Sequence, residues 1–109
     1  MNDTKEITEA LLKFRDERDW EQFHTAKDLA LALNIEAGEL LEAFLWKSSE
    51  QADSDKVKEE LADVFAFAFL LAEKYDFDVK QIVLEKMEKN ALKYPVAKSS
   101  GIAKKYTEL

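Results

Sequence analysis

The sequence predicts an all-α protein, a small bundle of four helices, and three observations support this fold class. Apolar residues recur at three- and four-residue spacings along most of the chain. Two glycines and one proline are very few for a chain built from β-turns. With 47% hydrophobic and 36% charged residues, the composition is that of a folded domain with a core. The length of 109 residues fits one domain over residues 1–109.

Local signals place the four helices. We expect them over the approximate ranges 4–18, 26–47, 55–75 and 79–93. Thr25, Ser54 and Asp78 are candidate N-caps, because each precedes an apolar periodic stretch. The fourth helix must end before Pro95, since the residue before a proline disfavours helix. Most connections are short, so neighbouring helices should pack antiparallel. Residues 95–109 form a short tail with lysines in its middle.

The third helix is unusually apolar. Every residue from Leu61 to Ala72 is apolar except Asp63. A helix that is apolar on all sides is buried on all sides, which is hard to achieve in so small a chain. We therefore expect a homodimer or homotetramer that packs through this Phe/Ala-rich helix. The alternative is a monomer in which the helix is central and well covered.

Composition excludes several kinds of function. Cysteine is absent, and His24 is the one histidine, so disulfides, thiolate zinc sites and sites with two imidazoles are excluded. A net charge of −7 without a basic run argues against binding a nucleic-acid polymer or an anionic membrane. The most apolar run is too short to span a bilayer, and the first residues are polar. A cytoplasmic location is expected.

The acidic residues are the informative feature. Glu36, Glu39 and Glu42 are three residues apart on the second helix, and Glu60 and Asp63 are three apart on the third. Residues at this spacing share one face of a helix, where like charges destabilise it. A solvated helix normally offsets such pairs with a lysine or arginine three or four residues away. At these spacings only Glu60 has a cation within reach, and that cation is Lys56.

A divalent cation would satisfy these acids. Asp63 lies inside the apolar run, and a buried carboxylate without a partner costs several kcal/mol. The four carboxylates of Glu36, Glu39, Glu60 and Asp63 offer oxygen ligands alone, which suits Mg²⁺, with Mn²⁺ as a substitute. Magnesium usually binds together with substrate phosphates, which indicates phosphate-ester or pyrophosphate chemistry. The alternative is a solvated acidic face, with Asp63 bonded to a distant lysine or backbone amide.

Candidate phosphate and base partners lie elsewhere in the chain. Lys86, Asn90 and Tyr94 are four residues apart, on one stripe of the fourth helix. Lysine and asparagine can donate to phosphate or sugar oxygens, although a solvated amphipathic face would look the same.

Aromatic groups flank the first two helices. Trp20, Phe23, His24 and Trp46 lie near their ends, where a nucleobase could stack. The alternative is packing in the core or at an interface, which is favoured for Phe23.

These residues together resemble a known family. Glu36-x-x-Glu39, a spacer of 20 residues and Glu60-x-x-Asp63 are similar to the signature of the MazG-like all-α nucleoside triphosphate pyrophosphohydrolases. Further stretches resemble the dCTP pyrophosphatase branch of that family. They are RDWEQFH at 18–24, GELLEAFLWK at 38–47, KMxxNxxxYP at 86–95 and KKYTEL at 104–109. The resemblance covers residues 11–109.

The resemblance implies an activity and a set of site residues. The activity is Mg²⁺-dependent hydrolysis of a (deoxy)nucleoside triphosphate, dCTP or a modified dCTP, between the α- and β-phosphates, in a helical dimer or tetramer. A non-catalytic nucleotide sensor on the same fold is the alternative. The implied metal ligands are Glu36, Glu39, Glu60 and Asp63, and the implied catalytic groups are Glu39, Glu42 and Glu60. The implied substrate-binding residues are Trp20, Gln22, Phe23, His24, Trp46, Phe67, Lys86, Asn90 and Tyr94.

Two positions depart from the family pattern. Relatives that favour cytosine tend to have tyrosine at the position of Phe67 and histidine at that of Leu11. Base selectivity depends on hydrogen bonds that the site must satisfy, so these departures leave the base preference open.

Overall fold

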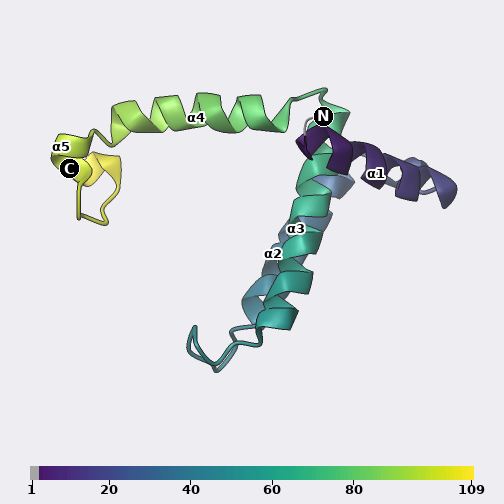
Figure 1. The fold of residues 1–109 in the computed structure, drawn as a ribbon, viewed down its shortest axis with the longest axis horizontal. Coiled ribbons are helices and arrows are strands. Elements are labelled where there is room, and N and C mark those ends of the chain that lie inside the picture. The colour runs from purple at the N-terminus through teal and green to yellow at the C-terminus, as the bar shows by residue number, and fades with distance from the viewer. Residues whose placement is uncertain (1–2) are drawn as a thin grey trace. The chain divides into compact units, whose positions relative to one another are not determined.

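The computed structural model describes residues 3–109, which form helices joined by turns and loops and contain no strand (Figure 1). The elements in chain order are α1 (Asp3–Glu17), η1 (Glu21–Phe23), α2 (Ala26–Glu42), α3 (Ser54–Lys74), α4 (Val79–Lys93), α5 (Val96–Ser99) and η2 (Tyr106–Glu108). The elements η1 and η2 are single turns of 3₁₀-helix. The all-α prediction with four main helices is confirmed.

The chain divides into two compact units, one ending at Phe77 and the other running from Asp78 to Leu109. The first contains α1, η1, α2 and α3, and the second contains α4, α5 and η2. The expectation of one domain over residues 1–109 stays a prediction. No helix within residues 3–109 is long and apolar enough to cross a membrane.

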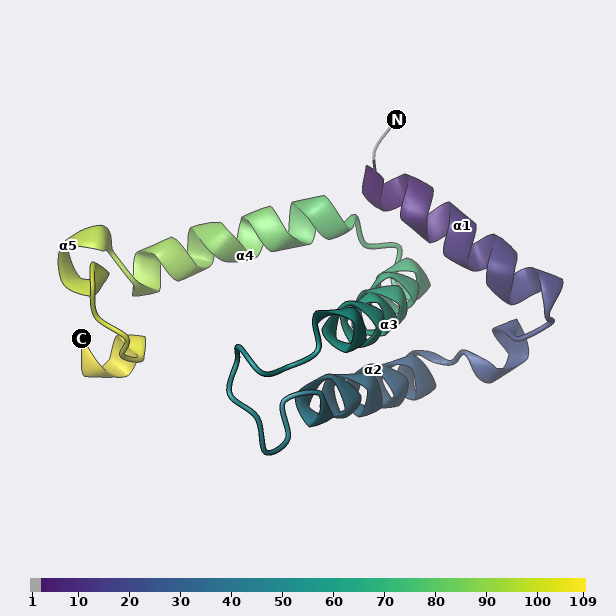
Figure 2. The ribbon, with the colours of Figure 1, turned by 60° about the horizontal axis from the view of Figure 1, so that its bottom comes forward.

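An antiparallel hairpin of α2 and α3 forms the centre of the first unit (Figure 2). The apolar core of this unit consists of Leu29, Ala43, Phe69, Leu70 and Ala72. Leu29 of α2 is only 1% exposed. The first helix, α1, packs against α3. The antiparallel prediction is therefore confirmed for the pair α2 and α3.

The helix starts follow the capping rules, with one correction. Thr25 Oγ1 accepts from the amide of Asp28 at 3.1 Å, and Asp78 Oδ1 accepts from that of Gln81 at 3.0 Å, as expected. The assignment of Ser54 as a cap was wrong, because Asp53 caps α3 and Ser54 is its first residue. Aspartate and serine cap equally well, so two adjacent candidates could not be separated by residue type.

The second helix ends five residues earlier than expected, at Glu42 rather than residue 47. The amides of Ala43, Phe44 and Leu45 bond to carbonyls three residues back, at 3.0–3.1 Å, which makes tight turns instead of α-helix. Trp46 then has a φ of 60°, a left-handed conformation that no continuing helix allows. Apolar periodicity continues through this segment, and for that reason the sequence did not reveal the end.

The third helix is less covered than its composition implies. Phe69, Leu70 and Ala72 near its end are buried, but Leu61 and Phe65 are 40% and 54% exposed. Burial on all sides is therefore not achieved within the first unit alone.

The second unit begins with α4, whose bounds are those predicted. The tail contains two short helical elements that the sequence did not predict, α5 and η2. Lys93 Nζ lies 4.8 Å from the ring centroid of Tyr106, and Tyr94 packs edge-on against the same ring at 6.1 Å. These aromatic contacts attach the tail to the end of α4.

Leu29→Ala should lower the free energy of unfolding by about 2–5 kcal/mol, because it leaves a cavity where the side chain is fully buried. Urea denaturation followed by circular dichroism measures the change. Leu41→Ala removes the same atoms from an exposed position on the same helix and should cost far less. Equal losses in the two variants would contradict the assignment of Leu29 to the core.

Candidate metal centre and adjoining cavity

The α2–α3 hairpin brings three acidic side chains together. One carboxylate oxygen each from Glu36, Glu60 and Asp63 lies within 4.8 Å of the other two. Glu36 comes from the middle of α2, and the other two come from successive turns of α3. Antiparallel pairing of the helices produces this convergence, because it places the two acidic faces opposite each other.

The two remaining glutamates of α2 differ in position. The negative charge of Glu39 is one of those that raise the pKa of Glu36, so its carboxyl group adjoins the group of three. Glu42 is exposed at the last residue of α2 and does not belong to that group. The structure thus brings four of the five predicted acids together.

Burial within the group falls on a different acid from the one expected. Glu60 is 6% exposed, whereas Asp63 is exposed, so the prediction of a buried Asp63 was wrong. Asp63 is exposed because it lies on the side of α3 that borders an open cavity. The predicted pairing of Glu60 with Lys56 is confirmed, with 2.6 Å between Oε1 and Nζ.

The surroundings of two buried carboxylate oxygens show whether the residues of this site fit a cation. Glu36 Oε2 and Glu60 Oε2 are buried, and neither has a hydrogen-bond donor among the described residues. Their neighbours are other carboxyl groups, which can donate only when protonated. Unpaired buried carboxylate oxygens are costly unless a cation meets them. An all-oxygen set of this kind fits a hard divalent ion such as Mg²⁺.

The pKa values report the same crowding. The pKa of Glu36 is raised to about 7, first by burial, then by a hydrogen bond with Glu39 and by the negative charges around it. The pKa of Glu60 is lowered, chiefly by its hydrogen bond with Lys56. Among the described residues, Lys56 pairs with Glu60, whereas no ion pair reaches Glu36.

A cavity of about 350 Å³ adjoins the acids. Its lining residues are Leu11, Phe14, Arg15, Trp20, His24, Asp63, Ala66, Phe67 and Leu70. Asp63 belongs both to this lining and to the acidic group, so the two features are continuous. Trp20 packs edge-on against Phe14, with 5.9 Å between ring centroids. The cavity therefore offers flat aromatic surfaces next to candidate metal ligands.

His24 is the polar ring in this wall. Its pKa is lowered, first by burial and then by the positive charges of Arg15 and Lys74. The ring is therefore neutral at pH 7 and can donate from one nitrogen and accept at the other. Its Nδ1 is buried and has no partner among the described residues.

Other predicted substrate-binding residues lie outside this cavity. Gln22 donates to the backbone carbonyl of Asp19 at 2.9 Å and so stabilises the turn before η1. Phe23 is 62% exposed and does not pack in the core of the chain. The expected helix over 26–47 would place Trp46 on one stripe with Glu39, but that expectation was wrong, because Trp46 lies beyond the end of α2 and is 93% exposed.

The remaining predicted residues belong to the second unit. Lys86 and Asn90 lie on α4, and Tyr94 is its C-terminal cap. Their spacing places them on one stripe, but a role in the site stays a prediction.

One polar residue of the cavity, Arg15, was not predicted from the sequence. Arg15 is 7% exposed and is paired with acids. A signal was available, because it lies at the end of an apolar-faced helix among Asp16, Glu17 and Glu21.

The fold and the site together define a class of protein. It is an all-α protein in which two antiparallel helices carry a carboxylate centre beside an aromatic cavity. A family model described as the MazG-like family matches residues 31–109. The chain is also similar to a pyrophosphatase from Archaeoglobus fulgidus whose crystal structure is known. The two sequences are 37% identical and the structures superpose with a TM-score of 0.80. The match covers 87% of this chain and 94% of the archaeal chain. This chain therefore belongs to the MazG-like family, as the sequence motifs predicted.

Curated relatives carry a more specific name. Proteins named dCTP pyrophosphatase 1 from Mus musculus and Bos taurus are 43% and 46% identical over 105 residues, which cover 89% of this chain. The chain spans 62% of the length of each of these relatives.

The raised pKa of Glu36 predicts how stability depends on pH. Its ordinary value is 4.5 and its folded value is about 7, so the folded state binds more protons between these values. The metal-free protein should lose stability as pH rises from 4.5 to 7, and Glu36→Gln should lose less. Thermal melts at steps of pH measure the difference.

The same proton competes with a cation. Mg²⁺ should therefore raise the melting temperature more at pH 8 than at pH 6. Equal increases at both values would contradict the assignment of Glu36 as a ligand.

Proposed function

We propose that this protein is a Mg²⁺-dependent nucleoside triphosphate pyrophosphohydrolase. It cleaves its substrate between the α- and β-phosphates and releases a nucleoside monophosphate and pyrophosphate. The observation that carries the proposal is the group of Glu36, Glu60 and Asp63, with two buried oxygens that lack donors, opening onto an aromatic cavity. The names of the relatives, pyrophosphatase and dCTP pyrophosphatase 1, support the same reaction.

The proposed substrate is dCTP or a modified dCTP. The cavity supplies aromatic faces from Trp20 and Phe67 and a neutral hydrogen-bonding ring from His24. Stacking on such faces contributes about 1–3 kcal/mol per base. Leu11 and Phe67 make part of the wall apolar, so the hydrogen bonds that select the base must come from His24 and the backbone around it. Removal of unwanted nucleotides from the pool is the purpose that fits this reaction.

The acidic residues have distinct proposed roles. Glu36, Glu60 and Asp63, joined by Glu39, would hold Mg²⁺, which when bound would neutralise phosphate charge and lower the pKa of a water. Glu39 adjoins these acids and forms no ion pair among the described residues, so we assign to it the role of accepting a proton from the attacking water. Glu42, one turn further along α2, would orient that water or a ligand.

Residues outside the cavity complete the proposed substrate set. Lys86, Asn90 and Tyr94 would contact phosphates or sugar, where lysine charge stabilises the leaving pyrophosphate. Gln22 and Phe23 in η1 and the exposed ring of Trp46 would contact the base region.

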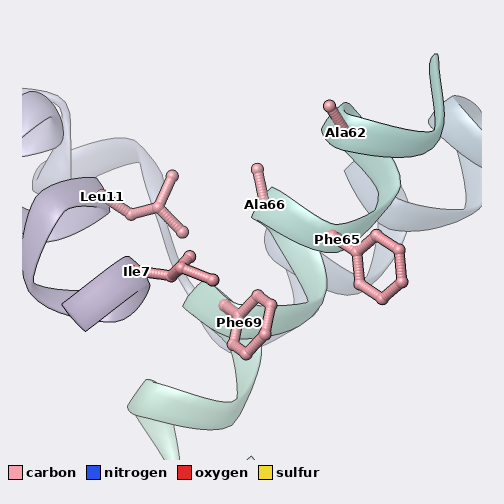
Figure 3. Close-up of a pocket in the computed structure, with 6 residues that line it drawn as sticks. All are labelled: Ile7, Leu11, Ala62, Phe65, Ala66 and Phe69. Carbon is pink, nitrogen blue, oxygen red and sulfur yellow. The ribbon is translucent and has the colours of Figure 1, made fainter. Parts of the chain in front are cut away.

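We also propose a homodimer or homotetramer that packs through α3. A groove of about 440 Å³ lies between α1 and α3, and its lining is Ile7, Leu11, Ala62, Phe65, Ala66 and Phe69. Figure 3 shows Ile7 and Leu11 of α1 on one side of the groove and Ala66 and Phe69 of α3 on the other. Phe65 is 54% exposed beside it. Covering this apolar surface with a second copy would remove it from water.

One incubation series tests the reaction. The protein with Mg²⁺ is given each common dNTP and NTP and 5-methyl-dCTP, and the products are separated. We expect monophosphate plus pyrophosphate, with cytosine nucleotides turned over fastest. Orthophosphate plus a diphosphate would overturn the proposed site of cleavage. Binding without turnover would support the alternative, a nucleotide sensor.

Glu39→Gln should lower kcat for dCTP about a hundredfold or more, because the carboxylate that accepts the proton is lost. The change keeps the size of the side chain, so the melting temperature without metal should stay close to that of the wild type. Glu59→Gln, an exposed acid on α3, is the matched control and should keep its activity. Near-normal turnover by Glu39→Gln would sink its assignment to catalysis.

Phe65→Glu should shift the protein towards monomer, because a charge in the groove opposes burial. Light scattering after size-exclusion chromatography measures the mass. Lys58→Glu adds a negative charge to α3 outside the groove and should leave the mass unchanged. A wild-type mass equal to one chain would refute the proposed assembly.

A further inference from the structure

The two walls of the cavity differ in what holds them in place. One wall belongs to α3, a helix of 21 residues with a buried end. The other comes from Trp20 and His24, which flank the three-residue η1. No residue of η1 is buried, and Trp20 is 44% exposed although it packs against Phe14, so hydrophobic burial fixes this second wall only in part. Some other interaction must set its distance from Asp63.

Arg15 connects to that segment through both its backbone and its side chain. Its carbonyl oxygen accepts from the amides of Arg18 and Trp20 at 3.2 and 3.1 Å. Its Nη2 lies 3.5 Å from Glu21 Oε2, in the first residue of η1. The intervening Asp19 has a φ of 55°, a left-handed conformation that reverses the chain at the end of α1. The turn is thus formed around Arg15.

The same guanidinium group also reaches the opposite wall. Its Nη1 lies 3.9 Å from Glu73 Oε2 on α3, and its Nε and Nη2 both lie 2.8 Å from Asp16 Oδ1. Arg15 is 7% exposed, so its guanidinium group is held inside the unit, while the side chains of Asp16, Glu21 and Glu73 reach it from the surface. One side chain therefore links α1, η1 and α3.

These contacts exclude the obvious alternative role. A buried arginine in a nucleotide cavity could itself bind phosphate. Here three carboxylates surround the guanidinium, so its charge is already compensated and its donors are directed at Asp16, Glu21 and Glu73. An anion would have to displace these acids. The role that remains is structural support of the cavity.

We propose that Arg15 is a positioning residue for substrate, which holds Trp20 and His24 at the correct distance from Asp63 through its link between Glu21 and Glu73. This inference rests on the proposed function, because it assigns a specific purpose to the wall of that nucleotide site. It predicts that weakening the link reduces substrate binding more than it reduces the chemical step. Lysine cannot replace the group, because a single ammonium does not reproduce the planar fork that contacts several acids at once.

Glu21→Gln is the sharpest test, because it cuts only the contact with η1 and changes a half-exposed side chain. We expect KM for dCTP to rise about tenfold and kcat to stay within about twofold. Arg15→Lys should show the same pattern. Lys13→Gln removes one positive charge from the exposed side of α1 and is the matched control, with KM unchanged.

A second readout does not depend on catalysis. In a Trp46→Phe background Trp20 is the one remaining tryptophan, and its fluorescence reports the wall directly. Glu21→Gln and Arg15→Lys should make Trp20 more accessible to acrylamide, while circular dichroism shows unchanged helix content. The Lys13→Gln control should leave the quenching as it is.

The outcomes separate the two proposals. Wild-type protein that fails to hydrolyse any nucleotide would refute the proposed function. Active wild-type protein, with KM and Trp20 quenching unchanged in both variants, would refute the role of Arg15. A loss of kcat with KM unchanged would also overturn it, because it would place Arg15 in the chemical step.

Discussion

The α2–α3 hairpin holds several acidic side chains close together, and the repulsion between them is the interaction that determines the properties of the site. Packing of Leu29 against its neighbours holds the two helices together, and with them Glu36, Glu60 and Asp63 within 4.8 Å. Lys56 compensates the charge of Glu60, and burial together with the charges around it raises the pKa of Glu36 to about 7. A cation bound between these acids would relieve the electrostatic repulsion that the fold imposes on them. The favourable free energy of packing in the hairpin core thus offsets the unfavourable free energy of holding these acids together without a metal ion.

The cavity beside this centre is built on a different principle. Its α3 wall is fixed by regular helix hydrogen bonds, while the wall formed by Trp20 and His24 is held by ion pairs around Arg15 and a left-handed turn at Asp19. Regular helices give exact spacing to ligands of a metal, where small errors are costly. A short segment held by charge can be changed without disturbing the helices, which suits the part of a site that reads the base.

Several apolar and aromatic side chains remain largely exposed within their own unit of the chain. Phe65 borders an apolar groove between α1 and α3, and Trp46 is 93% exposed in a left-handed turn. Exposed apolar surface is unfavourable in water, and the proposed assembly of several copies would cover it. The proposed dimer or tetramer therefore follows from the same apolar α3 that composition marked as unusual.

The sequence by itself determined the features that depend on neighbours along the chain. The bounds of α4, the caps at Thr25 and Asp78, the Lys56–Glu60 pair and the acidic faces of two helices all follow from spacings of three or four residues. The family followed from the same motifs. Only the tertiary structure decided that Glu60 and not Asp63 is the buried acid, that α2 stops at Glu42, and that Arg15 links three elements. Burial and long-range ion pairs depend on which side of a helix meets another element, and periodicity within one helix carries no information about that direction.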